Sequence, residues 1–414
     1  MSLKIRKIPF FLCLIFLCSN RFAYLMPETL GVSILNFENI TVGLAALFIL
    51  YYIFSYRHVK VKYEYGWLAV IGIVLALTSS LQGAALYSGQ SFLDGLSCQK
   101  YMLVGIVMYF PLTKLIKLGK ISIEDIEKVL AICAVLQIIL YFIQYILGPT
   151  HMFLSCYYTT PGYDSRVTRI RLYGYTYSIV ATLMFCMNRI VKAEAKKWDY
   201  VYATITLIFA VVINQGRQYI VSVVVIILSA FIFAKVKSYK KIVILILVVV
   251  IATNIFSMDF SQNLLNELST TTVTSSNTTA VRLRAQTFYL NVLRDHPILG
   301  GGYADVSVYS AAIASGYTQK YYIADNGIIA FFFRYGYLGL IFIIPLIISL
   351  IFGGIKGRRN KDVIAFMQLS TMIVGVINDA TWFDGFGLMY VFIYLIYMET
   401  TAHYKTTESV NISC

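Results

Sequence analysis

Long apolar segments joined by short polar loops dominate the chain, and one long polar stretch interrupts them. A helix that crosses a membrane needs about 17–25 residues, most of them apolar. Apolar segments near this length, some of them slightly short, predict twelve spans, at 8–26, 40–56, 67–86, 101–118, 126–147, 171–190, 199–214, 218–234, 242–257, 326–352, 362–380 and 384–399. The pattern predicts an all-α polytopic membrane protein. Only Gln215-Gly216-Arg217 separates the seventh and eighth spans, which therefore also fit a single broken hairpin.

The spans divide the chain into three parts. We predict transmembrane helices one to nine over 1–257, a large external loop over 258–325, and the last three helices with a cytoplasmic tail over 326–414. The composition agrees with a membrane protein, since 59% of the residues are apolar and only 13% are charged. Soluble domains have about 45–50% and about 25%, respectively.

The net charge of +14 would indicate a nucleic-acid partner in a soluble protein. Here most basic residues fall in the loops on one side of the predicted membrane, including the N-terminal Lys4-Ile5-Arg6-Lys7. Membrane proteins keep such an excess on the cytoplasmic side. We therefore expect both termini to be cytoplasmic, lipids to be the surrounding partner, and no nucleic acid to bind.

The external loops carry basic residues against this bias, and these are mainly arginines, whereas the cytoplasmic loops contain mainly lysine. Guanidinium is planar, permanently charged and suited to two-point contact with phosphate. The alternative is that the arginines only pair with nearby aspartates. The external arginines are Arg166, Arg169, Arg171, Arg217, Arg282, Arg284 and Arg294.

The loop over 258–325 has a recognisable internal order. It contains a polar tract, 269–279, that we expect to be mobile because it lacks residues to form a core. A helix is predicted over 280–295, with Val281, Ala285, Phe288 and Val292 on one face and Arg284, Thr287, Asn291 and Asp295 on the opposite one. Gly300-Gly301-Gly302 then predicts either a close approach to a ligand or a simple helix stop.

Common catalytic motifs are missing. The sequence contains no phosphate-binding loop, no zinc-protease motif and no Ser/His/Asp signature, and its four histidines do not cluster, so we expect neither a metal nor a cofactor. Asp325 lies where the external loop meets the next span. It is either a helix N-cap or a general base that acts on a sugar hydroxyl.

Several of these elements together resemble the bacterial O-antigen polymerase and O-antigen ligase superfamily, with the closest likeness to Wzy polymerases of O-antigen and capsule. The elements are the Gly216-Arg217-Gln218 turn, Arg282 and Arg284, His296-Pro297-Ile298-Leu299-Gly300-Gly301-Gly302, Asp325-Asn326-Gly327 and Phe333-Arg334-Tyr335-Gly336-Tyr337-Leu338-Gly339-Leu340.

The resemblance implies a GT-C-like, metal-independent glycosyltransferase in the bacterial cytoplasmic membrane. It would move a growing glycan from undecaprenyl pyrophosphate to a lipid-linked repeat unit, with undecaprenyl-pyrophosphate-linked oligosaccharides and a chain-length regulator as partners. The resemblance implies that the catalytic residues are Asp325, Arg217, Arg282 and Arg284. The general base is either Asp325 or a group of the substrate itself. The spacing does not decide whether Arg282 or Arg284 is the key arginine of the loop. The expected substrate-binding residues are Arg171, Arg166, Arg169, His296, Asn326 and Arg334.

Two other functions remain in competition. Ligases of this superfamily carry a histidine before the asparagine at the end of the large loop, where this chain has Asp325, and this difference favours a polymerase. A transporter of lipid-linked oligosaccharides would be expected to show paired internal repeats. The large loop has no counterpart in the first half of the chain, so the pattern favours an enzyme.

Overall fold

The computed structural model describes residues 7–20, 34–148, 151, 153–154, 157–159, 171–173, 176–234, 278–378 and 387–401. The predicted span at 242–257 and positions 269–277 of the predicted mobile tract lie outside the described residues. Thr278 and Thr279, the last residues of that tract, belong to a helix.

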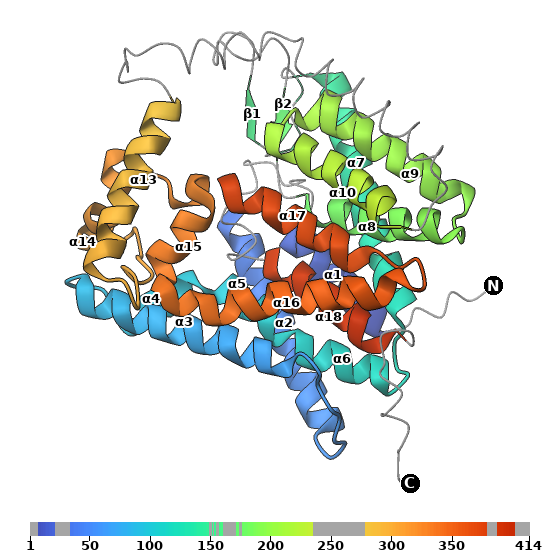
Figure 1. Ribbon diagram of the computed structural model, residues 1–414, viewed down its shortest axis with the longest axis horizontal. Helices are drawn as coiled ribbons and strands as arrows, with labels where there is room; N and C mark the ends of the chain where they lie inside the picture. Colours follow the sequence, from blue (N-terminus) through green and yellow to red (C-terminus); the bar gives the residue numbers. More distant parts are fainter. Residues whose placement is uncertain are drawn as a thin grey trace.

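The elements follow one another as in Figure 1. The first part contains α1 (Lys7–Ser19), α2 (Ile34–Tyr56), α3 (Gly66–Leu86), α4 (Phe92–Cys98), α5 (Lys100–Val107), α6 (Tyr109–Lys117) and α7 (Ile123–Leu147). The middle part contains β1 (Tyr157–Thr159), β2 (Arg171–Tyr173), α8 (Tyr177–Lys192), α9 (Lys197–Ile208), the π-helix η4 (Phe209–Asn214) and α10 (Arg217–Phe233). The last part contains α13 (Thr278–Asp295), α14 (Tyr309–Ala314), the 3-10 helices η5 (Tyr317–Gln319) and η6 (Ile323–Asn326), α15 (Gly327–Tyr335), the 3-10 helix η7 (Gly336–Gly339), α16 (Leu340–Arg358), α17 (Ile364–Asn378) and α18 (Gly387–Thr400).

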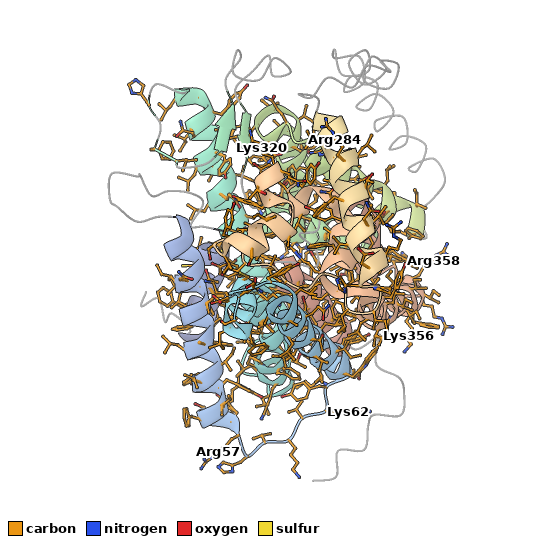
Figure 2. All side chains as sticks on the ribbon, turned by 90° about the vertical axis from the view of Figure 1, so that its left-hand side faces the viewer. Arg57, Lys62, Arg284, Lys320, Lys356 and Arg358 are labelled. Atoms are coloured by element: carbon orange, nitrogen blue, oxygen red, sulfur yellow. The ribbon has the colours of Figure 1, made fainter. Side chains whose placement is uncertain are left out.

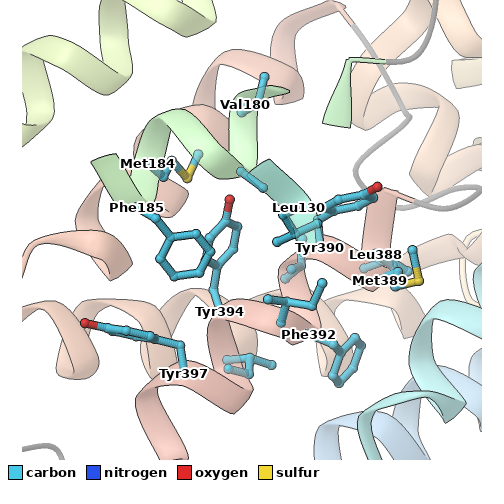
Figure 3. Close-up of a cluster of buried hydrophobic side chains, with 14 of the residues drawn as sticks. Leu130, Val180, Met184, Phe185, Leu388, Met389, Tyr390, Phe392, Tyr394 and Tyr397 are labelled. Atoms are coloured by element: carbon cyan, nitrogen blue, oxygen red, sulfur yellow. The ribbon is translucent and has the colours of Figure 1, made fainter. Parts of the chain in front are cut away.

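The helix α18 lies at the centre of the bundle. Its residues from Gly387 to Glu399 are all buried, as expected for a helix that is apolar on every side. It packs against α5, α6, α8 and α17. Figure 3 shows Tyr390 and Tyr394 of α18 in one cluster with Phe185 of α8 and Leu130 of α7. This packing joins the beginning, middle and end of the chain into one core.

Other helices leave apolar faces uncovered. On α3, Trp67, Val70, Val74, Leu77 and Leu81 are exposed at alternating spacings of three and four residues, which is one helical stripe. Helix α16 has a similar stripe that includes Ile341, Ile344 and Ile348. Within the described residues, the stretches long and apolar enough to cross a membrane are Asn39–Tyr56, Gly66–Leu86, Ile123–Leu147 and Gly327–Arg358. These features indicate a polytopic membrane protein.

The predicted span at 101–118 is two helices rather than one. Helix α5 ends at Val107 and α6 begins at Tyr109. Pro111 has no N–H to donate to the carbonyl of Val107, and its ring crowds that carbonyl. A continuous helix is therefore interrupted one turn before Pro111.

The predicted span at 171–190 begins too early, and the all-helical prediction misses a strand pair. Residues 171–173 form β2, which pairs antiparallel with β1 so that Leu172 lies opposite Tyr158. Leu172 is buried in the main core. Helix α8 begins only at Tyr177, because the preceding residues are used in the strand.

The predicted span at 326–352 is bent and longer than expected. Helix α15 ends at Tyr335, where Gly336 adopts a φ of +59°, and α16 continues to Arg358. Glycine adopts a positive φ without a steric penalty, so it can end the helix here. The bend turns α15 toward α13.

Candidate functional site

Residues 278–339 form a small substructure that we call the cap. Its helices α13, α14 and α15 lie together at the left end of the molecule in Figure 1. The cap contains the helix with the loop arginines, the Gly300–Gly302 run and the Asp325-Asn326 turn. It therefore gathers most of the motifs that the sequence analysis selected.

Helix α13 confirms the predicted amphipathic pattern. Ala285 and Tyr289 are buried, whereas Arg282 and Arg284 are exposed. Figure 2 shows Arg284 and Lys320 in the upper part of the molecule, and Arg57 at its lower end. The helix thus holds its apolar face against the protein and leaves both arginine side chains accessible.

Aromatic packing holds α13 on α15. The ring of Tyr289 lies 4.8 Å from the ring of Phe333, and both side chains are fully buried. The Tyr289 hydroxyl donates a hydrogen bond of 2.9 Å to the backbone carbonyl of Tyr321. This bond ties α13 to the loop that leads to Asp325.

The glycine run packs backbone against backbone. A Cβ atom on Gly302 would lie 2.3 Å from the backbone nitrogen of Gly83 in α3, and one on Gly300 would lie 2.5 Å from the carbonyl oxygen of Phe333. Both glycines have positive φ, +67° for Gly300 and +72° for Gly302. The glycine run thus approaches the backbone of other elements closely, which neither the predicted ligand contact nor the predicted helix stop describes.

Polar side chains at the end of α3 fix this contact. Tyr87 donates through its hydroxyl to the carbonyl of Gly301 at 2.6 Å, and Gln82 donates to the carbonyl of Gly300 at 3.2 Å. Gln90 donates to the carbonyl of Tyr303 at 2.7 Å. Burial raises the pKa of Tyr87, so its hydroxyl remains a donor. The cap is thus fastened to α3 by hydrogen bonds as well as by close packing.

Arg334 lies inside the cap rather than on its surface. Only 8% of its surface is exposed, and its guanidinium carbon lies 4.6 Å from the centre of the Tyr303 ring. Its backbone carbonyl accepts a hydrogen bond from the Ser79 hydroxyl. These contacts place Arg334 beside Tyr303, the residue that follows the glycine run, and its expected role in substrate binding stays a prediction.

The Asp325-Asn326 turn forms the η6 helix immediately before α15. Asn326 is buried and donates through its side-chain amide to the carbonyl of Tyr322 at 2.8 Å. The residue at the N-cap position of α15 is Asn326, which makes no side-chain cap hydrogen bond, and Asp325 lies one residue earlier. The structure describes the backbone of Asp325 but not its side chain.

The small turn between the seventh and eighth predicted spans is well ordered in its backbone. It follows the π-helix η4, an irregularity that often marks functional sites. Gln215 has a positive φ of +51°, and the amide N–H of Gly216 donates to the side-chain oxygen of Asn214. Arg217 is the first residue of α10, and its side chain is outside the described part of the structure.

Helix α17 connects this turn with the cap. It packs against α10, which begins at Arg217, and also against α15 and η6, which contains Asp325. Strand β2, which begins at Arg171, packs against η4. Helix α17 is thus the element that the Arg217 helix and the cap share, and β2 reaches the Arg217 turn through η4.

The structure says less about the remaining predicted site residues. Arg166 and Arg169 lie outside the described residues, and so does the side chain of Arg171. His296 is partly exposed at the end of α13. Among the residues that the structure describes, no group of three His, Cys, Asp or Glu side chains could hold a metal ion.

One family model matches the chain. It is described as O-antigen ligase, and it covers residues 202–344, from α9 to the start of α16. The matched segment, residues 202–344, is similar to this family. This match confirms the resemblance to the O-antigen polymerase and ligase superfamily, and it is common to both branches. No curated protein sequence matches the chain.

The sequence analysis missed three residues that hold the cap in place. Gln82, Tyr87 and Gln90 come from the end of α3, outside the matched region and more than two hundred positions away from their partners. The sequence did contain one sign of these residues, since polar side chains lie beside small residues at the end of an apolar span. That signal indicates a polar contact but does not identify the partner.

Proposed function

We propose that this protein is a polysaccharide polymerase of the bacterial cytoplasmic membrane, with both termini in the cytoplasm. It would transfer a growing O-antigen or capsular glycan from undecaprenyl pyrophosphate to a lipid-linked repeat unit at the outer face of the membrane. A chain-length regulator would be a further partner. The proposal rests mainly on the cap, which holds the exposed loop arginines of α13 and the Asp325-Asn326 turn in one packed unit.

In the proposed reaction, the bond between the anomeric carbon of the donor glycan and its phosphate oxygen breaks, and a bond to an acceptor hydroxyl oxygen forms. Arg217 and one of Arg282 and Arg284 stabilise the departing pyrophosphate. Asp325 accepts the proton of the acceptor hydroxyl. Arginine supplies the positive charge that a metal ion provides in other glycosyltransferases, so the proposed mechanism needs no metal.

The Arg217 turn and the Asp325 turn belong to different parts of the chain, and their packing against one shared helix supports this division of roles. Helix α17 packs against both α10 and η6. A donor pyrophosphate at the Arg217 turn would therefore lie on one side of the outer end of α17, with the acceptor at the Asp325 turn on the other. The expected contributions of Arg171, Arg166, Arg169 and His296 are to bind the lipid-linked substrates.

Analysis of surface polysaccharide from a strain that lacks this chain tests the proposal against ligase activity. A polymerase deletion leaves a single repeat unit on the carrier or on the lipid A core. A ligase deletion instead leaves complete lipid-linked polymer without attachment. Asp325 favours the polymerase, since ligases of the superfamily carry a histidine at the corresponding place.

A further inference from the structure

Two tyrosine side chains are exposed on the cap at a place where the fold does not need them. Tyr317 is 47% exposed and Tyr322 is 51% exposed. Their ring centres are 6.0 Å apart and their planes are nearly perpendicular, at 81°. We call Tyr317 and Tyr322 the tyrosine pair. Together they form an exposed aromatic surface on the outside of the cap.

The backbone beneath the tyrosine pair is held in place. Asn326 donates to the carbonyl of Tyr322, and Tyr289 donates to the carbonyl of the preceding residue, Tyr321. The ring of Tyr321 turns inward and packs 5.7 Å from the ring of Phe288 on α13. This inward neighbour and the two backbone bonds leave Tyr322 directed outward from a fixed support.

The surroundings of the tyrosine pair are polar. Thr318, Gln319 and Lys320 lie between the two tyrosines in the sequence, and all are exposed. Tyr309 of α14, also on the cap, has different neighbours. It is 78% exposed and lies one helical turn from the exposed Ile313. An aromatic ring beside apolar residues suits a lipid surface, whereas one surrounded by hydrogen-bonding groups suits a ligand that is both apolar and polar.

A sugar ring has both properties. Its C–H groups form apolar faces that pack on aromatic rings, and its hydroxyls need donors and acceptors such as Thr318, Gln319 and Lys320. Tyr322 is the N-cap of η6, the single turn that contains Asp325. A sugar on the tyrosine pair would therefore lie within a few residues of the proposed general base.

We propose that the tyrosine pair, together with Thr318, Gln319 and Lys320, is a sugar-binding subsite for the acceptor glycan. The proposal rests on the proposed polymerase function, because only in that reaction does Asp325 act on an acceptor sugar. The subsite orients the acceptor so that its hydroxyl meets Asp325. The pair binds through ring faces, so the requirement is for aromatic side chains rather than for their hydroxyls.

The test compares Tyr317→Ala and Tyr322→Ala with the control Tyr309→Ala in full-length protein reconstituted in liposomes. Lipid-linked repeat units from a strain that lacks this chain serve as substrate. Each variant of the tyrosine pair should raise KM for the repeat unit by roughly three- to tenfold, the range expected for loss of one aromatic contact. The control should leave KM unchanged, and Tyr322→Trp should restore a value near that of the wild type.

A binding measurement separates the subsite from the reaction. The probe is the oligosaccharide released from the lipid-linked repeat unit by mild acid, detected by saturation-transfer NMR on protein in nanodiscs. Wild type and the Tyr309→Ala control should give the transfer signal, and Tyr317→Ala and Tyr322→Ala should lose most of it. Equal signals and equal KM values in all proteins, with a wild type that polymerises, would overturn the subsite alone.

Failure of the proposed function gives a different pattern, since the wild type itself would then lengthen no glycan. The membrane interface is the other surface that exposed tyrosines fit. Brominated lipids distinguish it, because they quench tryptophan only on contact. Quenching of Tyr322→Trp beyond that of the unsubstituted protein would place the pair in the membrane and overturn the subsite, whereas the proposal expects no additional quenching.

Discussion

Replacement of Gly302 by alanine tests whether the contact between the cap and α3 controls the site. Gly302 has a φ of +72°, and its added Cβ would lie 2.3 Å from the Gly83 nitrogen and 2.8 Å from the Gly83 Cα. A left-handed residue with a side chain costs about 1–2 kcal/mol. Overpacking in a tight contact costs about 1–3 kcal/mol, and here the obstructing atoms are backbone, which cannot rotate away. Together these effects predict a loss of about 2–5 kcal/mol in stability.

Gly89→Ala is the matched control. Gly89 also has positive φ, +83°, but its nearest neighbour would be a Val308 methyl carbon at 4.0 Å. The control therefore has the same kind of backbone strain without the clash, and should lose only about 1–2 kcal/mol.

The assay is the melting temperature of purified protein in detergent, followed by polymer length in cells. We expect Gly302→Ala to melt well below Gly89→Ala and to produce mainly short glycan, because the cap shifts away from α3. Equal melting temperatures and equal polymer lengths for the two variants would refute the claim that backbone contact at Gly302 positions the cap.

Three further predictions concern the chemistry and its support. Asp325→Asn should lower kcat by about 10²–10⁴ if the carboxylate is the general base, whereas a rate close to the wild type would favour the substrate-assisted route. Extensive treatment with EDTA should leave polymerisation by the reconstituted protein unchanged, because arginines supply the positive charge; loss of activity that Mg²⁺ restores would contradict this. A double-mutant cycle with Arg334→Met and Tyr303→Leu should give a coupling energy of about 0.5–2 kcal/mol in stability, and additive effects would mean that the stacked pair contributes nothing.

Helix α13 shows what the sequence alone can predict. Its apolar positions recur over four turns, so both its existence and its buried face followed from periodicity, and the structure confirms Ala285 inside and Arg284 outside. Tyr289 is also buried, although it was not among the residues predicted for that face. The regular spans were predicted for the same reason. Local repetition carries enough information to fix a helix and its orientation.

Features that depend on distant partners were not predictable in this way. The glycine run showed only that the backbone could turn or approach something closely, and the approaching atom belongs to Gly83 in α3. Strand β2 forms because residues 157–159 pair with it. The sequence of 171–190 alone does not show this pairing, so the predicted helix began too early. The contact between Arg334 and the ring of Tyr303 was likewise not predictable, because the two residues are about thirty positions apart in the sequence.

The most direct test of the central claim is polymerisation by the purified protein in liposomes, with lipid-linked repeat units as the only glycan and no transmembrane gradient. We predict a ladder of lengthened glycan for the wild type. Arg217→Ala and at least one of Arg282→Ala and Arg284→Ala should lower the rate by about 10²–10³, as expected for removal of one charge-stabilising donor. Ladders of wild-type rate and length from all three variants would contradict the arginine site, and a wild type that leaves every repeat unit single would contradict the polymerase itself.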